Sequence, residues 1–357
     1  MKPNAATPLG PIEHYTQASL PDRIIRQRVA HHNRMLAEEL PDDPPFLVED
    51  ALRRMRHRPS TARTHLWVLR QGRSIVAEAS LGWADLPSNR HSAHVDVSVE
   101  PHLRRHGIGT RLLALAVARA RQVLRLRLFA HSSGRIPAGA RFLRRHGFKA
   151  GFQHHLNQLA IERLDRALLA RWLAAGTECA AAGYAMEMWD GPVPERWLVA
   201  FAELCGVMNG APHGDLEVED VTVTPKMIRE GEAALLATGS RCLVACARHA
   251  ASGVLVGFTE LFWNPKRAAI VWQQNTGVIE AHRKQGLGRW LKAANMEALL
   301  AANPDARLVR TGNADSNAPM LAINRQMGFQ PFIAGTGWQG RVPAVSARLR
   351  CPPGLRR

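Results

Sequence analysis

The sequence predicts an α/β protein in which a fold with a mixed α+β sheet occurs twice in tandem. The chain has 357 residues, enough for two domains that each bury a core of their own. One motif, a strand followed by a glycine loop and a helix, occurs in both halves, at Val97–Leu112 and Thr276–Leu291. We therefore expect an N-terminal domain over residues 1–162, a connecting helix over 163–180 and a C-terminal domain over 181–357.

The patterns of the first half predict the element order α α β β β α β α β. Pro21 is typical of a first helical turn, QGR between two strand-like runs indicates a hairpin, and alternating Val95, Val97 and Val99 indicate a half-buried strand. Residues 1–12 are rich in Pro and Asn, and we expect them to be irregular. The expected helices are 21–40, 47–58, 110–123 and 137–146, and the expected strands are 64–70, 74–84, 91–100, 125–133 and 148–161.

The second half shows the same kinds of pattern after a connecting helix at 161–177. Asn209-Gly210 is typical of a helix C-terminus, and Ser252-Gly253 joins two apolar runs as a hairpin would. The expected helices are 191–210, 225–238, 289–302 and 318–327. The expected strands are 184–189, 241–250, 254–263, 268–278 and 306–314, with further strands in 328–349.

The two glycine loops have the chemistry of an anion site. A helix N-terminus carries unpaired backbone N–H groups and a partial positive charge, and glycine lets an anion approach that backbone closely. Neither loop has the G-x-x-x-x-G-K-[ST] pattern of a P-loop. Neither has the third glycine of a dinucleotide fingerprint, because Leu112 and Leu291 stand there.

The loop sequences RRHGIG (Arg104–Gly109) and RKQGLG (Arg283–Gly288) resemble the diphosphate-binding loop of the GNAT acyltransferase superfamily. In each half a helix that ends in Gly-Phe follows the loop about 35–40 residues later, at Gly147-Phe148 and Gly328-Phe329. The resemblance implies two tandem GNAT-like domains that use acetyl-CoA or another acyl-CoA as donor, without a metal. The tandem plan is similar to that of mycothiol synthase, in which the C-terminal half carries out the reaction, so we expect the C-terminal domain to be catalytic.

The resemblance also implies which residues would hold the cofactor, namely the end of the strand, the loop and the first helical turn. In the first domain these are Val97, Ser98, Val99, Arg104, Arg105, His106, Gly107, Ile108, Gly109 and Thr110. In the second domain they are Thr276, Gly277, Val278, Arg283, Lys284, Gln285, Gly286, Leu287, Gly288 and Arg289, with Asn313 and Asn317 further on. The alternative for the two asparagines is an ordinary role in turns and helix caps.

Catalytic side chains are less clearly marked than the loops. Many family members carry a tyrosine four residues before the Gly-Phe, as the acid that protonates the leaving thiolate. Leu143 and Asn324 stand there in this chain, and asparagine can donate a hydrogen bond but is a poor acid. Glu260, in an otherwise apolar strand, is the candidate general base, and its alternative is a solvent-facing strand residue. Glu78 and Asp96 are the parallel candidates in the first domain.

Charge and composition limit the partners. The net charge of +17 favours polyanionic ligands such as CoA, but no basic block is interleaved with aromatic residues, so nucleic acid is not expected. The five cysteines show no metal-ligand spacing and indicate a reducing compartment, and no segment predicts a signal peptide or membrane span.

We expect a cytoplasmic monomer or homodimer that acetylates a primary amine of a small molecule. The alternative is a non-catalytic protein that binds acyl-CoA as a regulatory ligand, because the tyrosine is missing from both halves.

Overall fold

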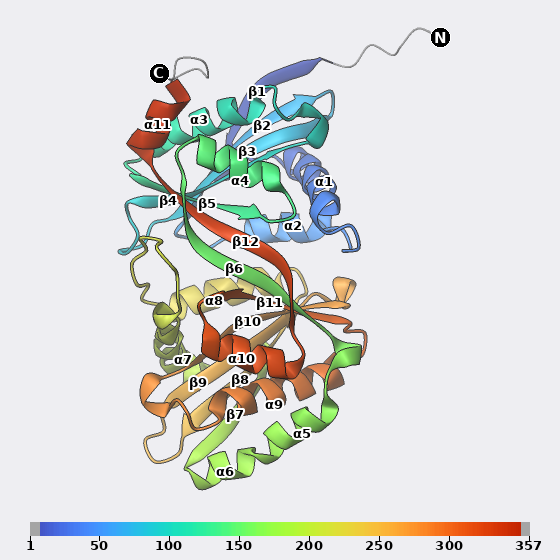
Figure 1. Cartoon of the computed structure of the whole chain (residues 1–357), viewed down its shortest axis with the longest axis vertical. Coiled ribbons are helices and arrows are strands. Elements are labelled where there is room, and N and C mark those ends of the chain that lie inside the picture. The colour runs from blue at the N-terminus through green and yellow to red at the C-terminus, as the bar shows by residue number, and fades with distance from the viewer. Residues whose placement is uncertain (1–7, 351–357) are drawn as a thin grey trace. The chain divides into compact units, whose positions relative to one another are not determined.

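Two units make up the part of the chain that the computed structural model describes, residues 8–350 (Figure 1). The first unit runs to Phe152 and also includes Asp215–Val218 and the chain from Gly335. The second consists of Gln153–Gly214 and Glu219–Ala334. Each unit contains one glycine loop and a mixed sheet covered by helices, so the predicted fold class is confirmed.

The sheet of the first unit has the strand order β1-β2-β3-β4-β5-β12, and its neighbours are antiparallel except for β4 and β5. Helix α3 packs on one face over a core that includes Trp67 and Leu69, and α1 packs on the other face over Leu66 and Val68. This alternation follows the two-residue period of a strand. The elements are β1 (Leu9–Thr16), α1 (Asp22–Glu39), α2 (Val48–Arg56), β2 (Ala62–Gln71), β3 (Ser74–Ala84), β4 (Ser92–Val99), α3 (Ile108–Gln122), β5 (Arg127–Ser133), α4 (Pro137–Arg145) and α11 (Val342–Arg350).

The second unit repeats this plan with the strand order β7-β8-β9-β10-β11-β6, in which only β10 and β11 are parallel. Helix α9 covers the face that carries Leu243 and Leu261, and α7 covers the face that carries Val244 and Phe258. The elements are α5 (Arg166–Ala174), α6 (Gly176–Ala181), β7 (Tyr184–Asp190), α7 (Leu198–Cys205), α8 (Pro225–Leu236), β8 (Arg241–His249), β9 (Leu255–Trp263), β10 (Ile270–Val278), α9 (Leu287–Ala302), β11 (Leu308–Ala314) and α10 (Ala318–Met327).

Each unit takes its last strand from the other half of the sequence. Strand β6 (Lys149–Ala160) pairs through residues 154–160 with β11 of the second unit, and β12 (Gln330–Arg341) pairs through residues 335–341 with β5 of the first. The predicted boundaries at residues 162 and 181 followed sequence order, which does not reveal this exchange. The physical reason is that strand pairing depends on contacts far apart in sequence, which local patterns do not encode.

Three element predictions were wrong. Residues 1–12 were expected to be irregular, but residues 9–12 begin β1, while residues 1–7 lie outside the described residues. In this edge strand Pro11 is tolerated because the ladder is interrupted between Leu9 and Ile12. The end of the segment expected to supply only strands is α11, in which Val342 and Val345 share a buried face at helical spacing. The connecting segment is not one helix, because it contains α5 and α6 as separate helices.

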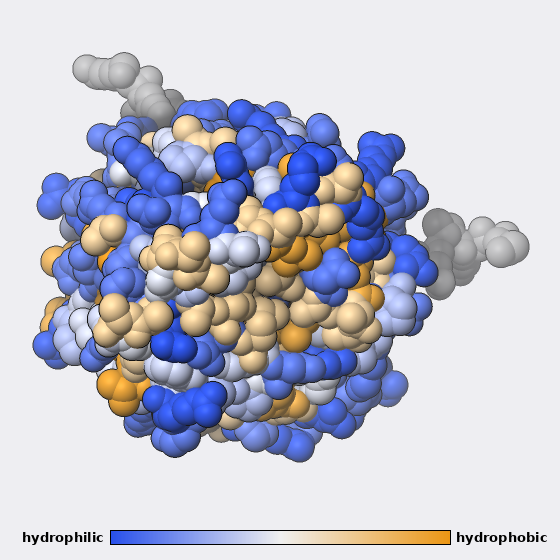
Figure 2. Space-filling model, turned by 90° about the horizontal axis from the view of Figure 1, so that it is seen from below, coloured by the Kyte–Doolittle hydropathy of each residue, from blue (hydrophilic) through white to orange (hydrophobic). Residues whose placement is uncertain are grey.

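The distribution of polar and apolar residues can be followed on one face of the molecule. On the face seen in Figure 2, weakly apolar residues gather in the middle and strongly hydrophilic ones lie mostly around them, so hydrophilic residues form no continuous stripe there. Within residues 8–350, the helices are all too short or too polar to cross a lipid bilayer.

The strand exchange predicts that a fragment of residues 1–162 does not form a stable unit. It would lose β12 and α11, and with them the buried side chains of Trp338, Val342 and Val345, which are each at most 3% exposed. At about 1.5–3 kcal/mol for each buried apolar side chain, the loss is comparable with the whole stability of a domain. Thermal unfolding followed by circular dichroism should show no cooperative transition for this fragment.

The control is the same fragment joined through a long flexible glycine–serine linker to residues 330–350. A cooperative transition should return in that variant. If the fragment without the added segment already unfolds cooperatively at the temperature of the full chain, the exchanged strand is not needed.

Candidate functional site

The two glycine loops have the same backbone conformation. Gly107 and Gly286 precede α3 and α9 with φ angles of 77° and 78°, and neither helix start has a side-chain cap. Two positions earlier, Arg105 and Lys284 are also left-handed, with φ of 70° and 63°. Residues other than glycine adopt this conformation at a cost, and such strain tends to gather at functional sites. The repeated conformation leaves the first amides of each helix open to an anion.

An arginine fastens each loop to the strand before it. Arg104 Nε donates to the Val99 carbonyl at 2.9 Å, and Arg283 Nε donates to the Val278 carbonyl at 3.0 Å. The two arginines differ in their remaining nitrogens. Those of Arg104 bind both carboxylate oxygens of Glu38 on α1, at 2.7 and 2.5 Å. Arg283 forms no ion pair with a carboxylate in the described part of the chain, so its charge is available to a ligand.

The strand before each loop separates from its parallel neighbour. Strand β4 pairs with β5 only from Ser92 to His94, and β10 pairs with β11 only from Ile270 to Trp272. Beyond these points the edges that carry the predicted residues Val97–Val99 and Thr276–Val278 have no ladder on that side. The resemblance to the GNAT family predicts that an extended pantetheine arm adds to such an edge as a further strand would.

Several predicted loop residues can act only through their backbone. The side chains of Ile108 and Leu287 are 5% and 2% exposed and belong to the cores. An added Cβ at Gly109 would lie 3.3 Å from the Phe142 ring, and at Gly288 it would lie 3.4 Å from Ile323. The side chains on the loop surfaces are Arg105, His106, Lys284, Gln285 and Arg289, and Thr110 lies 3.2 Å from His146 Nε2.

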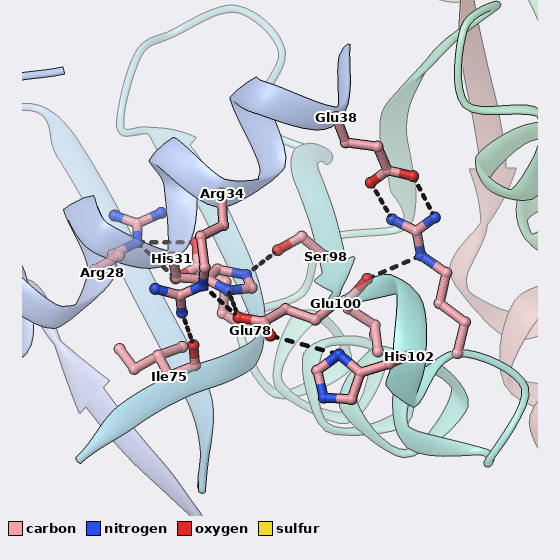
Figure 3. Close-up of polar contacts among 11 residues, drawn as sticks. Arg28, His31, Arg34, Glu38, Ile75, Glu78, Ser98, Glu100 and His102 are labelled. Atoms are coloured by element: carbon pink, nitrogen blue, oxygen red, sulfur yellow. Dashed lines mark hydrogen bonds and ion pairs between the residues drawn. The ribbon is translucent and has the colours of Figure 1, made fainter. Parts of the chain in front are cut away.

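Polar side chains of the first unit are paired with one another beside its open strand (Figure 3). His31 on α1, which is 1% exposed, hydrogen-bonds Ser98 Oγ at 2.6 Å, so this predicted cofactor residue already has a partner. Arg34 binds Glu100 at 2.7 Å and also donates to the Ile75 carbonyl. Burial lowers the pKa of His31, and the nearby carboxylates oppose that shift.

The parallel base candidates of the first unit are also placed by the structure. Both carboxylate oxygens of Glu78 lie 3.0 Å from Arg28 Nε on α1, so this group is an ion-pair partner (Figure 3). Asp96 pairs with Ser80 in the ladder of β3 and β4. That ladder runs without interruption from Ala77, opposite Val99, to Gly82, opposite His94.

The corresponding ladder of the second unit contains a β-bulge. Leu261 lies opposite Gln273, but Thr259 lies opposite Thr276, so three steps on β10 face two on β9. The extra residue falls within Gln274–Asn275, directly before the predicted cofactor residues. A bulge of this kind turns backbone groups and side chains out of the regular ladder, and bulges are frequent next to active sites.

Glu260 lies on β9 opposite this bulge. Asn275 Nδ2 donates to Glu260 Oε2 at 3.0 Å. Burial raises the pKa of Glu260 to about 7, and hydrogen bonds from the Asn275 side chain and backbone hold it from rising further. Ser80 is the residue of the first unit that matches Glu260, because Ala79 faces Val97 as Thr259 faces Thr276. Of the two matching positions, only that of the second unit carries a carboxylate.

The asparagines of the second unit form a short chain of hydrogen bonds. Asn324, which is 1% exposed, donates to Asn313 Oδ1 at 2.8 Å, and Asn157 on β6 donates to the same oxygen at 3.2 Å. Asn324 Oδ1 is buried and has no hydrogen-bond partner in residues 8–350. Asn317 caps α10 by accepting from the Met320 amide, which is the structural role left open for it. Leu143 is a core residue of the first unit.

Sequence reasoning missed Asn275, Gln273, Lys292 and Thr259, all in or beside the bulge. Their polar side chains contact one another or Glu260. The signal in the sequence that could have marked this group is Lys292, a charged residue at a position where the helical period of α9 calls for an apolar one. Among the described residues, no three His, Cys, Asp or Glu side chains are grouped so as to hold a metal ion.

Comparisons with known proteins agree with this geometry. The family model "Acetyltransferase (GNAT) domain" matches residues 62–150, which include the first loop. Among solved structures, a tandem GNAT protein from the clavulanic acid biosynthesis pathway superposes with a TM-score of 0.73 at 26% identity, over 93% of this chain and 99% of that one. A GCN5-related N-acetyltransferase from Sphaerobacter thermophilus gives a TM-score of 0.63 at 15% identity, over 92% and 96%.

The search of curated protein sequences gives no match. The match of the family model to the first unit, the matching loop geometry in both units and the near full-length superposition on a tandem GNAT protein support one conclusion. Residues 62–150 are identified as a GNAT acetyltransferase domain, and the chain as a whole is similar to a tandem GNAT protein.

Proposed function

We propose that the second unit transfers an acetyl group, or another acyl group, from acyl-CoA to a primary amine of a small molecule. The observation that carries this proposal is the combination of the open strand edge and the bulge of β10 with a half-buried carboxylate opposite the bulge on β9, whose pKa is raised to about 7. The amine nitrogen attacks the thioester carbon, so a C–N bond forms and the C–S bond breaks. Backbone N–H groups of β10 stabilise the oxyanion, as preorganised dipoles do in acyl transfer.

Glu260 is the proposed general base. It takes the proton that the amine loses on attack, and the departing CoA thiolate takes up one proton, so the overall proton balance is zero. A base with a pKa near 7 is well matched to proton transfer at neutral pH. Asn324 is the proposed hydrogen-bonding residue on the side of the leaving group, with Asn313 holding its amide in place.

The proposed cofactor residues of the second unit are the loop amides at residues 284–288, the cation Arg283 and the strand edge Thr276–Val278. For the first unit we propose a non-catalytic role, in which its loop binds CoA weakly or not at all. Glu38 already neutralises Arg104, and His31 already occupies Ser98.

The compartment we propose is the cytoplasm. The described cysteines Cys179, Cys205, Cys242 and Cys246 are free thiols, and burial raises the pKa of each of them. Free unreactive thiols are typical of a reducing environment.

Replacing Glu260 by Gln should lower kcat by about 100-fold or more, because removal of a general base typically costs a factor of 10² to 10⁴. The assay is release of CoA thiol from acetyl-CoA in the presence of a panel of primary amines. Binding of acetyl-CoA should be unchanged. Glu297→Gln on the exposed side of α9 is the matched control, and an equal loss in both variants would exclude Glu260 as the base.

The pH dependence of kcat should show the titration of Glu260. Its pKa is raised from the usual 4.5 to about 7, so the carboxylate is protonated and inactive below pH 7, and activity rises as pH increases through that value. The Gln variant should lose this limb of the profile. A limb that persists unchanged in the variant would assign the titration to another group.

Gly109→Val and Gly288→Val should separate the two units. Gly288 lies in the first turn of α9, where a Cβ would already be 3.4 Å from Ile323 on α10, so the methyl groups of valine would crowd that side chain. At Gly109 a Cβ would lie 3.3 Å from the Phe142 ring. We expect loss of turnover only in Gly288→Val, with thermal unfolding checked for both variants. If Gly109→Val alone abolishes turnover, the first unit is the catalytic one.

Glu38→Gln should strengthen binding of CoA to the first unit, because it frees the charge of Arg104. A part-exposed ion pair contributes about 0.2–1 kcal/mol, so the gain should be about 1.4- to fivefold. The gain in CoA affinity is measured by isothermal titration calorimetry in the Gly288→Val background, in which the loop of the second unit is disabled. The titrations compare Gly288→Val alone with Gly288→Val combined with Glu38→Gln. Glu39→Gln is the control, and no difference between the two glutamates would show that Arg104 does not contact the ligand.

A further inference from the structure

A buried lysine without an acidic partner lies beneath the bulge of the second unit. Lys292 on α9 is 2% exposed, and its Nζ donates to Gln273 Oε1 at 3.2 Å. Its Nζ also lies 5.7 Å from the centre of the Phe329 ring, and no carboxylate in residues 8–350 pairs with it. Burying an ammonium group in such surroundings is costly. Burial lowers the pKa of Lys292 to about 7, which reduces that cost by favouring the neutral amine.

Gln273 connects this lysine to the bulge. Its Nε2 donates to the Glu260 carbonyl at 2.7 Å and to Thr259 Oγ1 at 2.9 Å. Glu260 has no partner on β10 in the register of this pair, because the bulge skips it. The side-chain amide of Gln273 therefore supplies the donor that a regular ladder would supply to this carbonyl. Lys292 in turn satisfies and orients the oxygen of Gln273.

Two further contacts hold the same segment. Thr259 Oγ1 and Thr276 Oγ1 lie 2.7 Å apart across the bulge, and Asn295 on α9 donates to the Thr259 carbonyl at 3.3 Å. The bulge is thus fixed from the α9 face by Lys292, Gln273 and the threonines. From the opposite face it is fixed by the hydrogen bond between Asn275 and Glu260.

The first unit has apolar residues at the positions that match the polar group on the α9 face of the bulge. Counting from the glycines that precede α3 and α9, Leu113 matches Lys292 and Ala116 matches Asn295. In the ladders, Leu81 faces Val95 as Leu261 faces Gln273, and Ala79 faces Val97 as Thr259 faces Thr276. These residues belong to the hydrophobic core of the first unit or pack against it, and its ladder has no bulge.

Stability alone does not account for the polar group. The first unit shows that the same frame accepts apolar residues at these positions, and replacing a buried polar network with apolar groups is often neutral or stabilising. The polar group, the bulge and Glu260 occur together in the second unit, and all three are missing from the first.

We propose that Lys292 is a positioning residue of the second unit, which with Gln273 fixes the bulge of β10 and so aligns Glu260 and the β10 amides for acyl transfer. The proposal rests on the function proposed above for this unit. Lys292 makes no contact with the substrate and acts only through its hydrogen bond to Gln273.

The test uses the full chain and two variants that introduce the residues of the first unit, Lys292→Leu and Lys292→Leu with Gln273→Val. The probe is acetyl-CoA with the amine of the panel that gives the fastest thiol release in the parent protein. We expect kcat to fall about 10- to 100-fold in both, because small misplacements of reacting groups cost this much, with KM for acetyl-CoA within about threefold. The midpoint temperature of thermal unfolding should fall in the single variant, because Gln273 Oε1 is left unpaired. It should return to the parent value in the double variant, which removes that oxygen.

Leu113→Met in the first unit is the matched control, and it should leave kcat unchanged. Recovery of kcat together with thermal stability in the double variant would show a merely structural role and overturn the proposal. An equal loss of kcat in Leu113→Met would do the same.

A second readout does not depend on the acceptor. Hydrogen exchange of Ile270–Val278 should accelerate in Lys292→Leu, while that of Ser92–Val99 stays unchanged. If the parent releases no thiol with any amine, the proposed function fails, and this exchange measurement still decides whether Lys292 fixes the bulge. Unchanged exchange in Ile270–Val278 would overturn the inference.

Discussion

In each unit the loop and the strand before it are arranged around the unpaired backbone amides at the start of one helix, α3 in the first unit and α9 in the second. In both units the helix begins at a left-handed glycine without a side-chain cap, and an arginine ties the loop to the carbonyl at the end of the preceding strand. The strand itself leaves its parallel neighbour a few residues earlier. Because amides at a helix start need an acceptor, the arrangement suits an anion.

The two units use this common frame differently. In the first unit, side chains that line the open strand and the loop are paired with α1, through His31 with Ser98 and Glu38 with Arg104 (Figure 3). In the second unit Arg283 forms no ion pair with a described carboxylate, and the strand carries a bulge with Glu260 opposite. The two units thus share one backbone frame but differ in the polar groups that stand beside the open strand.

The loops could be predicted from the sequence because their geometry is local. Left-handed φ angles at Gly107 and Gly286, and the contact between each arginine and the strand five residues before it, depend on residues close together in the chain. Glu260 could be singled out because a charged residue interrupts an apolar strand, although the raised pKa depends on burial that only the fold supplies.

The rest of the architecture depends on contacts that no local pattern contains. The exchange of β6 and β12 is set by pairing with β11 and β5, which lie far away in sequence. The bulge is a property of β9 and β10 together, so the roles of Asn275 and Gln273 could not be predicted from either strand alone. Helix α11 could not be predicted from the sequence, because it is short and only two of its apolar residues, Val342 and Val345, are buried at helical spacing.

A crystal structure of the full chain with acetyl-CoA tests the central claim most directly. The account predicts the diphosphate at the amides of residues 284–288, the pantetheine arm along Thr276–Val278, and the thioester carbonyl beside the bulge within reach of an amine held by Glu260. A diphosphate bound only at residues 104–109, or an acyl group remote from the bulge, would contradict it.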